Sequence, residues 1–409
     1  MNHDSSSSFQ GDLKAEHIER YSRQLLIKGG FGVEGQLKLL NSSVLVIGAG
    51  GIGSTVILYL AACGIGSLSV IDFDDVDVSN LHRQVIHKTN DVGMNKAESA
   101  RRAVENLNPT LSCKIIKEPL TVNNALELIS SHDCIVDASD NPQTRYIIND
   151  ACVLSGKPLV SGSAMGIEGQ LTVCNYKGGP CYRCLYPKPN VKEGNKSCSD
   201  NGVLGPVPGL IGILQAVETI KIITGTDDVL SDRLLMYDSL QCSFLRIKKP
   251  PKQTHCPVCG PEATITSMKE CFEASQTARG PSCSLAKSEP RNISNSLSIS
   301  CTEYDQIRNS GDTHILLDVR GKEQFDLCSL PGAINLPLGS ITQQMEYIST
   351  ISNGTKPVYC ICRRGNASVM ATNKIVEGLQ KYPNIHSVKN ITGGLTSWRS
   401  KVDKSFPNY

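Results

Sequence analysis

The stretch SVLVIGAGGIG, residues 43 to 53, decides the fold of the first half of this chain. Its first five residues are mostly β-branched or apolar, as expected of a parallel strand that is buried on both faces. The glycines that follow allow a tight turn and a close approach of the backbone to a phosphate. A helix predicted from Ile52 to Cys63 would offer its N-terminal amides to that anion. The stretch therefore predicts a strand, loop and helix that bind a nucleotide.

Short β-branched runs alternate with amphipathic segments over residues 15 to 260. Further buried strands are predicted at residues 68–72 and 134–139, and a further helix at residues 95–106. This alternation is typical of parallel strands joined by crossover helices. It predicts an α/β fold with a Rossmann-like, doubly wound sheet.

A second α/β unit is predicted from residue 296 to 409. Its expected elements are strands at 314–319, 357–361 and 386–391, and a helix at 366–380. Residues 261–295 are rich in Ser, Thr, Glu, Lys, Gly and Pro and show no periodicity, which predicts a linker. The Ser-rich residues 1–14 are predicted to be disordered. The expected organisation is thus two domains, 15–260 and 296–409.

Charge and cysteine content exclude some classes of function. The 41 Lys and Arg residues nearly balance 39 Asp and Glu residues, so no basic face for direct nucleic-acid binding is expected. The 17 cysteines include two C-x-x-C pairs and do not resemble a disulfide framework, which indicates a reducing compartment. The N-terminus has no apolar signal core, and the apolar stretch from Val203 to Val217 is interrupted by Pro and Gly. We therefore expect a cytosolic protein with no membrane span.

Charged residues beyond the predicted strands indicate which nucleotide chemistry the glycine loop serves. Asp72 ends the second strand, Arg83 and Lys96 follow it, and DASDN (residues 137–141) ends the third. The two cations would neutralise charge that develops during phosphoryl transfer, and an Asp can hold magnesium. The glycine loop alone is also compatible with NAD or FAD, but hydride transfer does not need this set of charges.

Five motifs, in this order and spacing, resemble the ubiquitin-activating-enzyme superfamily: ERYSRQLL (19–26), GAGGIG (48–53), SNLHRQ (79–84), GMNKAESA (93–100) and DASDN. Within it they are similar to the bacterial molybdopterin-synthase and thiamine-pathway adenylyltransferases. The resemblance implies that the glycine loop binds ATP, that the first Asp binds ribose, and that Arg, Lys and the second Asp surround the phosphates with magnesium. It also implies a homodimer in which an arginine of one subunit reaches the site of the other.

Carried over residue by residue, the resemblance implies a set of ATP-binding positions in this sequence. His82 departs from the family pattern and is expected to be a solvated neighbour rather than a catalyst. Arg23 matches the arginine that crosses the dimer. The implied nucleotide-binding residues are Gly51, Asp72, Ser79, Asn80, Leu81, His82, Arg83, Lys96, Asp140 and Asn141, together with Arg23.

Two C-x-x-C pairs predict a metal site. CYRC supplies Cys181 and Cys184, and CPVC supplies Cys256 and Cys259. Four thiolates complete the tetrahedral shell of zinc and leave no position open, so the site would be structural. Two unrelated pairs or a redox motif are the alternative, because the pairs lie far apart in the sequence. The activating family carries the same four-cysteine site, which implies the pairing.

Cys198 is a candidate nucleophile. It lies in KSCSDNGVLGPVPGLIG (residues 196–212), where a polar, glycine-rich loop precedes an apolar helix-like stretch. A cysteine at or before the start of a helix can have a lowered pKa, although composition alone favours an inert thiol. The segment resembles the catalytic-cysteine loop of the activating family. That resemblance implies a covalent role for Cys198, as a thioester or an acyl disulfide.

A second cysteine loop, CRRGNAS (residues 362–368), follows a predicted strand and opens a helix. The amides of such a loop converge on the sulfur and its arginines add positive potential, which suits an anionic persulfide on Cys362. Phosphatase loops need five residues between Cys and Arg and do not fit. Cys360 is expected in the core, and Asp318 and Arg320 are expected to brace the loop. In this loop and in three further segments, the chain resembles a rhodanese sulfurtransferase. The three segments are LLDVR (316–320), LPGAINLP (330–337) and TGGLTSW (392–398).

The combination of these parts in one chain resembles a eukaryotic family of adenylyltransferases and sulfurtransferases of molybdenum cofactor synthesis. The resemblance implies two protein substrates, a ubiquitin-related modifier and the small subunit of molybdopterin synthase. It implies a role in 2-thiolation of the tRNA wobble uridine and in molybdopterin biosynthesis, with a cysteine desulfurase as the sulfur donor to Cys362.

Several alternatives stand beside that interpretation. The enzyme could activate one carrier alone, or could make only thioesters, against which the rhodanese half argues. A nicotinamide oxidoreductase fused to a rhodanese is a different class of enzyme. A non-catalytic scaffold is the last alternative, and the intact Arg83, Lys96, Asp140, Cys198 and Cys362 argue against it.

Overall fold

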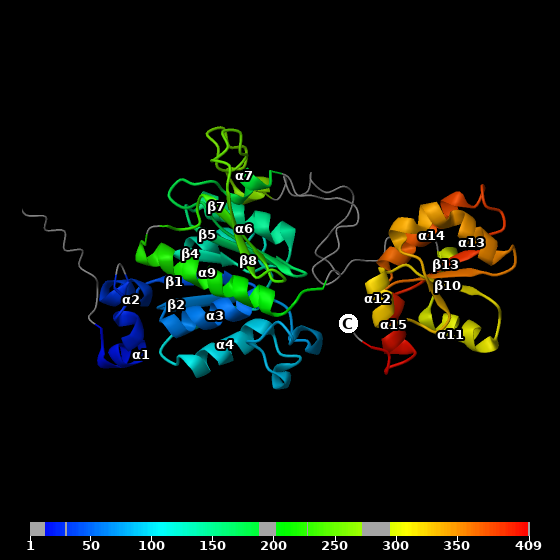
Figure 1. The fold of residues 1–409 in the computed structure, drawn as a ribbon, viewed down its shortest axis with the longest axis horizontal. Coiled ribbons are helices and arrows are strands. Elements are labelled where there is room, and N and C mark those ends of the chain that lie inside the picture. The colour runs from blue at the N-terminus through cyan, green and yellow to red at the C-terminus, as the bar shows by residue number, and fades with distance from the viewer. Residues whose placement is uncertain (1–12, 29–30, 188–201, 227, 272–294, 408–409) are drawn as a thin grey trace, which may run out of the picture. The chain divides into compact units, whose positions relative to one another are not determined.

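The computed structural model describes residues 13–28, 31–187, 202–226, 228–271 and 295–407. The chain forms two compact units, Met1–Pro281 and Ser282–Tyr409, and each is described by itself (Figure 1).

An eight-stranded sheet forms the centre of the first unit, in the order β3-β2-β1-β4-β5-β6-β7-β8. The strands from β3 to β5 are parallel, and those from β5 to β8 are antiparallel. The doubly wound parallel half confirms the predicted α/β fold class. The strands are β1 (Ser43–Ile47), β2 (Ser67–Ile71), β3 (Ser112–Ile116), β4 (Cys134–Asp137), β5 (Leu159–Met165), β6 (Glu168–Cys174), β7 (Arg233–Asp238) and β8 (Ser243–Lys248).

Helices cover both faces of the parallel half, and the side chains of β1 alternate between two cores. Val44 and Val46 pack with residues of α3, α4 and α9, whereas Leu45 and Ile47 pack with residues of α5 and α6. Burial on both faces explains why this strand reads as a continuous apolar run. The helices are α1 (Ala15–Leu25), α2 (Gly32–Leu40), α3 (Gly51–Cys63), α4 (Lys96–Leu107), α5 (Ala125–Ser130), α6 (Pro142–Leu154), α7 (Tyr182–Leu185) and α9 (Pro206–Thr224), with the 3-10 turns η1 (Val78–Asn80) and η2 (Thr89–Asp91).

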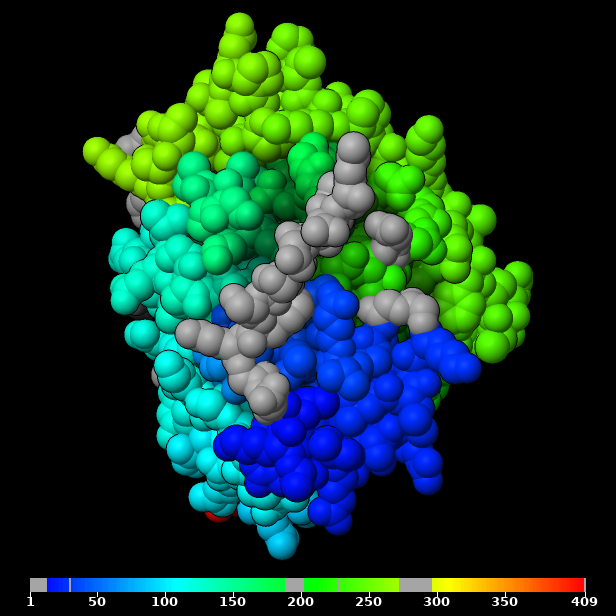
Figure 2. Space-filling view, turned by 90° about the vertical axis from the view of Figure 1, so that its left-hand side faces the viewer, coloured from blue at the N-terminus to red at the C-terminus, as the bar shows by residue number. Residues whose placement is uncertain are grey.

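Helices α1 and α2, dark blue in Figure 2, lie at one end of the first unit. Tyr21 of α1 is buried, and its hydroxyl accepts a hydrogen bond from Asn108 Nδ2 at 3.0 Å, which fixes the helix to the end of α4. The outer surface of this end carries large apolar side chains that are about half exposed or more: Ile18, Leu26, Ile27 and Val33.

Helix α9 packs directly on α3 and β5. It begins at Pro206, in the first turn where proline costs no hydrogen bond. The Thr55 hydroxyl donates to the Gly209 carbonyl at 2.7 Å, and Gly212 lies against the Ile52 carbonyl. By length and composition α9 could cross a membrane, and half of its most apolar window is buried inside the first unit. Its apolar character is therefore explained by core packing.

The beginning of the segment predicted to be a linker differs from that prediction. Ile265, Met268 and Cys271 are buried in the core that also contains the C-x-x-C pairs and residues of α6. The residues up to 271 thus belong to the first unit. Three apolar residues in so short a stretch show too little periodicity to indicate this burial.

A five-stranded parallel sheet, in the order β11-β10-β12-β13-β9, forms the second unit. In β12 the side chains of Val358 and Cys360 face one core, and those of Tyr359 and Ile361 face the other. The strands are β9 (Ser298–Ile299), β10 (Ile315–Asp318), β11 (Ala333–Asn335), β12 (Val358–Ile361) and β13 (Val388–Ile391). The helices are α11 (Cys301–Ser310), α12 (Lys322–Leu327), α13 (Met345–Ser352), α14 (Asn366–Gly378) and α15 (Gly394–Lys401), with η3 (Asn295–Leu297) and η4 (Leu338–Gln344).

The close contact between α3 and α9 can be tested by adding one methyl group. In Gly212→Ala the new Cβ would lie 2.2 Å from the Ile52 carbonyl oxygen, so we expect a loss of about 2 kcal/mol or more in the free energy of unfolding. Gly209→Ala is the control, because its nearest atom would be 3.7 Å away and Ala adds about 1 kcal/mol of helix propensity. Urea unfolding of the full chain measures both, and equal stabilities would contradict the packing argument.

Candidate active sites and metal centre

The glycine loop between β1 and α3 has no side chains that would keep its backbone away from the backbone of neighbouring segments. Gly48 has a φ of +99°, and a Cβ there would come within 2.8 Å of the Ala138 carbonyl oxygen at the end of β4. A Cβ on Gly53 would lie 2.0 Å from the Gly48 carbonyl oxygen. Only glycine fits at either position, so the N-terminus of α3 lies tight against the carboxyl ends of β1 and β4. Ligands of doubly wound sheets bind at this edge.

Asp72 lies directly beyond β2 and binds the glycine loop. Its Oδ2 accepts a hydrogen bond from the Ala49 amide at 2.8 Å, and its Oδ1 accepts one from the Asp74 amide at 2.9 Å. Burial raises the pKa of Asp72, and the nearby Lys96 ammonium opposes that shift. The structure thus brings the predicted ribose-binding residue to the loop.

Lys96 is held beside Asp72 by an acidic partner. Its Nζ is 2.8 Å from Asp74 Oδ2, and its side chain is only 7% exposed. Asn95 caps α4 and also donates from Nδ2 to the Asp72 and Asp74 carbonyls, at 3.0 and 3.1 Å. The buried cation therefore lies at the beginning of α4, close to the predicted nucleotide.

The SNLHRQ motif lies around η1. The Arg83 guanidinium donates to Asn80 Oδ1 at 2.7 Å, and the Arg83 Cγ would be 3.5 Å from a Cβ on Gly51. Arg83 therefore lies against the first residue of α3. The remaining candidates are on the surface side of the motif: Ser79 donates to Asp77, Leu81 follows η1, and the exposed His82 has Nδ1 3.0 Å from the Ser79 carbonyl.

The DASDN motif ends β4. Asp137 is buried and accepts from the amide and hydroxyl of Ser139, whereas Asp140 is exposed and has no hydrogen bond or ion pair with the described residues. Asn141 caps α6 by accepting from the Gln143 amide at 2.9 Å. Of the two aspartates, Asp140 has the carboxylate oxygens that a Mg²⁺ ion could bind.

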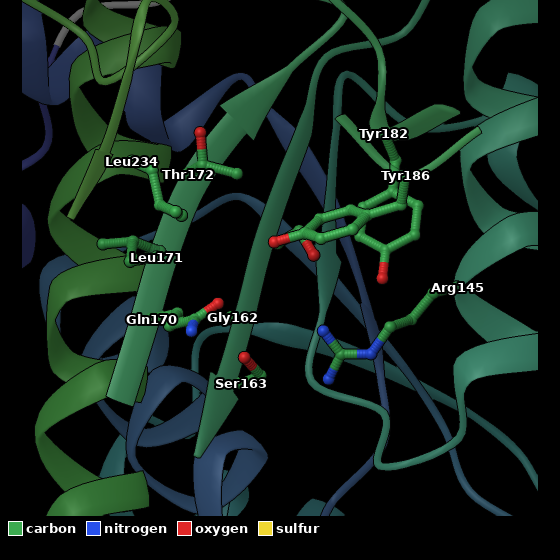
Figure 3. A pocket seen from close by; sticks show the side chains of 10 residues that line it. Arg145, Gly162, Ser163, Gln170, Leu171, Thr172, Tyr182, Tyr186 and Leu234 are labelled. Carbon is green, nitrogen blue, oxygen red and sulfur yellow. The ribbon is translucent and has the colours of Figure 1, made fainter. Parts of the chain in front are cut away.

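A polar pocket opens beside DASDN, on the face of the sheet that α6 covers (Figure 3). The Arg145 guanidinium donates to the Ser139 carbonyl at 2.8 Å, and it faces Ser163 and Gln170 across the pocket. The rings of Tyr182 and Tyr186, 4.9 Å apart, form another wall. The sequence did not indicate this pocket, because its residues are scattered over three strands, a helix and the segment from Tyr182 to Tyr186.

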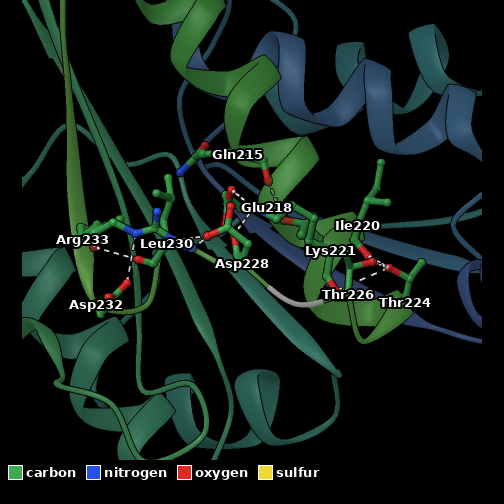
Figure 4. A network of polar contacts seen from close by, with 12 residues as sticks. Gln215, Glu218, Ile220, Lys221, Thr224, Thr226, Asp228, Leu230, Asp232 and Arg233 are labelled. Atoms are coloured by element: carbon green, nitrogen blue, oxygen red, sulfur yellow. Dashed lines mark hydrogen bonds and ion pairs between the residues drawn. The ribbon is translucent and has the colours of Figure 1, made fainter. Parts of the chain in front are cut away.

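Polar contacts fix α9 on the opposite face of β5 (Figure 4). Gln215 Nε2 donates to the Asp137 carbonyl at 2.7 Å, which ties the helix to the end of β4. Glu218 accepts from the Leu230 amide at 2.8 Å and pairs with Lys221 at 2.7 Å. Arg233 of β7 pairs with Asp228 and, at 3.1 Å, with Asp232, so the segment after α9 is also held.

Two candidates are not joined to these residues by any described contact. Arg23 is exposed in the last turn of α1. Cys198 lies outside the described residues.

The four predicted zinc ligands come together. The Sγ atoms of Cys181, Cys184, Cys256 and Cys259 all lie within 4.8 Å of one another, and three of the four residues are buried. A tetrahedral zinc shell with Zn–S distances of about 2.3 Å places sulfurs about 3.8 Å apart. The separations of 3.8 Å (Cys181 to Cys184), 3.6 Å (Cys181 to Cys256) and 3.4 Å (Cys184 to Cys259) are near that value. The residues present could therefore hold zinc.

A buried ion pair connects the first C-x-x-C pair to α6. Arg183 donates from Nε and Nη2 to the two carboxylate oxygens of Asp150, each at 2.7 Å. The Asn149 side chain accepts from the Tyr182 amide at 2.7 Å. The bidentate geometry is the strong form of this interaction. It fixes α6, and with it Asn141 and Arg145, relative to the metal centre.

In the second unit, Cys362 follows β12 and is nearly buried. Its Sγ accepts hydrogen bonds from the Gly365 amide at 3.2 Å and the Ser368 amide at 3.3 Å, and the Ser368 hydroxyl lies at 3.3 Å. Donors that converge on one position could bind the negative charge of a persulfide carried there. Cys360, two residues earlier, is fully buried, and burial raises its pKa to about 12. The two thiols therefore lie in opposite chemical environments.

The TGGLTSW segment supports the cysteine loop. The Leu395 amide donates to the Cys362 carbonyl at 2.9 Å, and a Cβ on Gly394 would lie 2.0 Å from that same oxygen. Asp318 and Arg320 form a buried ion pair, and Arg320 Nη2 also donates to the Cys328 carbonyl at 2.7 Å. Their described contacts thus brace the segments around β10.

Comparison with known proteins identifies the class. Residues 21–258 match the model of the ThiF family, and residues 300–401 match the rhodanese-like domain. The chain belongs to the ThiF family, and carries a rhodanese-like domain after it.

Relatives match this chain along most of their length. The adenylyltransferase and sulfurtransferase MOCS3 of Aedes aegypti is 43% identical over 403 residues, covering 97% of this chain and 90% of that protein. The protein of the same name from Dictyostelium discoideum is 42% identical, over 97% of this chain and 98% of that protein. A crystal structure of E. coli MccB with ATP has a TM-score of 0.53 at 25% identity, over 62% of this chain and 76% of that one. The protein is therefore an adenylyltransferase and sulfurtransferase, and the nicotinamide oxidoreductase alternative finds no support.

The metal centre makes a prediction for stability. Cys256→Ala, or treatment with a strong chelator, should lower the thermal midpoint of the first unit by roughly 10 °C, because a loss of about 4 kcal/mol has that effect in a domain of this size. Cys242→Ala, at an exposed cysteine, is the control and should leave the midpoint unchanged. Zinc content by mass spectrometry accompanies the melts. A preparation with no zinc and a chelator-insensitive melt would contradict the assignment.

Proposed function

We propose that this protein adenylates the C-terminal glycine of small ubiquitin-like sulfur carriers and then converts it to a thiocarboxylate. The observation that carries the proposal is the presence of two anion sites in one chain. A glycine loop with Asp72, Arg83 and Lys96 beside it suits the phosphates of ATP. A loop whose donors converge on Cys362 suits a persulfide.

In the adenylation step, the carrier carboxylate attacks the α-phosphorus of ATP and pyrophosphate leaves. Asp72 binds the ribose, while Arg83 and Lys96 stabilise the charge that develops on the phosphates. The exposed carboxylate of Asp140 is the residue that would hold magnesium, which supplies further charge neutralisation when bound. Ser79, Asn80, Leu81, His82 and Asn141 complete the surroundings of the nucleotide, with Gly51 beneath Arg83.

The polar pocket is the proposed path of the carrier's C-terminal tail. It opens beside Asp140, and its Arg145 guanidinium provides a positive charge that a terminal carboxylate would approach. Serine, threonine, glutamine and tyrosine side chains line it and can bond the amides of an extended peptide. The knuckle of the metal centre supplies one wall, so a structural zinc would help to hold the tail site.

A homodimer is proposed through the surface of α1 and α2. Ile18, Leu26, Ile27 and Val33 expose apolar area there, and Arg23 is exposed in the same helix as Ile18. Burial of such a surface between two subunits would stabilise the pair. It would also allow Arg23 of the partner subunit to reach the phosphates.

Sulfur transfer follows adenylation. The terminal sulfur of the Cys362 persulfide attacks the acyl-adenylate carbonyl, AMP leaves, and an acyl disulfide forms. A second thiol, for which Cys198 is the candidate, attacks the Cys362 sulfur and releases the thiocarboxylate. A cellular thiol then reduces the resulting disulfide, and a cysteine desulfurase reloads Cys362. The alternative is a thioester between the carrier and Cys198 before the sulfur arrives.

The proposed carriers are a ubiquitin-related modifier and the small subunit of molybdopterin synthase. Their thiocarboxylates would serve 2-thiolation of the tRNA wobble uridine and molybdopterin biosynthesis. The proposed location is the cytosol, since the cysteines of the described residues are free thiols. Mass spectrometry of each carrier after incubation with ATP and a sulfur source tests this choice. A carrier that gains no sulfur in place of oxygen is not a substrate.

The two chemical steps should separate by mutation. Cys362→Ala removes the sulfur that holds the persulfide, so thiocarboxylate formation should fall to background while carrier-dependent exchange of pyrophosphate into ATP persists. Cys360→Ala, at the buried thiol of β12, should retain sulfur transfer. Loss of both reactions in a folded Cys362→Ala protein would overturn the two-site proposal.

Asp140 provides a test of the first step. Asp140→Ala should reduce carrier-dependent exchange of pyrophosphate into ATP by about 100-fold or more, because it removes a group that acts on transition-state charge. Glu127→Ala, at an exposed carboxylate of α5, is the control and should keep the wild-type rate. Undiminished exchange in Asp140→Ala would show that this carboxylate has no part in the reaction.

A further inference from the structure

His87 contacts the glycine loop and has no role in the function described so far. It is 6% exposed, and its Nε2 lies 2.9 Å from the carbonyl oxygen of Ala49, in the middle of GAGGIG. Its Nδ1 lies 2.9 Å from the Ser99 hydroxyl on α4. That hydroxyl is also 2.9 Å from Asp91 Oδ2, at the end of η2. One side of the imidazole ring is thus held by Ser99 of α4, and the other side contacts the glycine loop.

The chemistry of the contact fixes which ring nitrogen carries hydrogen. A carbonyl oxygen only accepts hydrogen bonds, so Nε2–H of His87 donates to Ala49. Burial lowers the pKa of His87, and the neighbouring Lys96 ammonium acts in the same direction. The contact with the loop therefore requires a hydrogen on Nε2, whichever state Nδ1 has.

The Ala49 carbonyl and the Gly50 amide belong to one peptide unit. In a planar trans peptide the C=O and N–H bonds point in opposite directions, and no described peptide bond of this chain is cis. A donor that holds the Ala49 carbonyl in the interior therefore turns the Gly50 N–H the other way. The preceding peptide unit is held as well, because the Ala49 amide donates to Asp72 at 2.8 Å.

The amide that is oriented in this way has no partner among the residues that the structure describes. Neither Gly50 nor Gly51 donates a backbone hydrogen bond to any described residue, and α3 begins at Gly51. The first amides of a helix have no intrahelical acceptor and together form an anion site. Gly50, on one side of this peptide, widens the range of backbone angles it can adopt, so an external restraint helps to fix its direction.

We propose that His87 is a positioning residue, whose Nε2–H bond to the Ala49 carbonyl aims the Gly50 amide at the phosphates of ATP. The inference rests on the proposed ATP site and adds to it a residue that need not touch the nucleotide. Its effect is on how well the loop is arranged before ATP arrives. It predicts a change in ATP affinity that general loss of a buried histidine would not produce.

The chain offers a matched control in His132. This histidine is also buried, at 8% exposure, and burial lowers its pKa as well. Its Nε2 lies 2.7 Å from the Ser69 hydroxyl, and its Nδ1 lies 2.7 Å from the Leu128 carbonyl. With a third contact from Nδ1 to the Ser131 hydroxyl at 3.1 Å, it is at least as well held as His87, and none of its described contacts is with the glycine loop.

Four variants of the full chain test the proposal: His87→Ala, His87→Gln, His87→Asn and His132→Ala. Titration calorimetry measures the dissociation constant for ATP with magnesium, and thermal melting measures stability. His87→Ala should bind ATP about tenfold more weakly, the size expected for one lost hydrogen bond. His87→Gln should recover most of the affinity, because its amide nitrogen takes the place of Nε2. His87→Asn should not, because its amide reaches only the place of Nδ1.

His132→Ala should lower the melting temperature and leave the dissociation constant at the wild-type value. Wild-type affinity in His87→Ala, equal affinities of the Gln and Asn variants, or an equal loss in His132→Ala would each overturn the proposal. If His87→Ala does not fold, the comparison of Gln with Asn decides alone. A wild-type protein that binds no ATP would instead overturn the proposed function, which keeps the two failures distinct.

Discussion

The first unit depends on the contact of backbone with backbone where β1 turns into α3. A Cβ on Gly53 would lie 2.0 Å from the Gly48 carbonyl, and one on Gly48 would lie 2.8 Å from the Ala138 carbonyl. Without side chains at these positions, the first turn of α3 reaches the ends of β1 and β4 together. Helix α9 then fits against α3 through Gly212 by the same means. The candidate nucleotide site thus depends on how closely α3 approaches β1, β4 and α9.

Asp72 and Lys96, the two charges beside the glycine loop, have partners before any ligand binds. Asp72 is bonded to two loop amides, and Lys96 is paired with Asp74. Buried charges without partners would be costly, so the pairing stabilises the fold as well as the site. The same logic applies at Cys362, where amides and a hydroxyl surround one sulfur. Both candidate sites are loops that lead into a helix, α3 in the first unit and α14 in the second.

Local signals in the sequence predicted three strands of the parallel half, β1, β2 and β4, but not its edge strand β3. The strand Ser43–Ile47 has the predicted bounds, because an apolar β-branched run between a polar segment and a glycine loop has few other solutions. The antiparallel strands β5 to β8 were not predicted. LVSGSAM in β5 and EGQLTVC in β6 contain polar and glycine residues, which face the pocket or lie under α9. Their pairing is decided by neighbours that are distant in the sequence, and no local pattern records it.

The residues of the candidate site differ in the same way: some can be predicted from local sequence motifs, and others depend on contacts with residues distant in the sequence. Motif residues such as Asp72 and Arg83 could be named from the sequence, because function restricts both their type and their spacing. His87 could not, since a buried histidine in a core and a histidine that holds a phosphate loop look alike in a sequence. The difference between His87 and His132 lies only in which carbonyl or hydroxyl each ring nitrogen meets. Positioning residues of this kind become visible when hydrogen bonds are followed outward from the groups that touch the ligand to the groups that hold them.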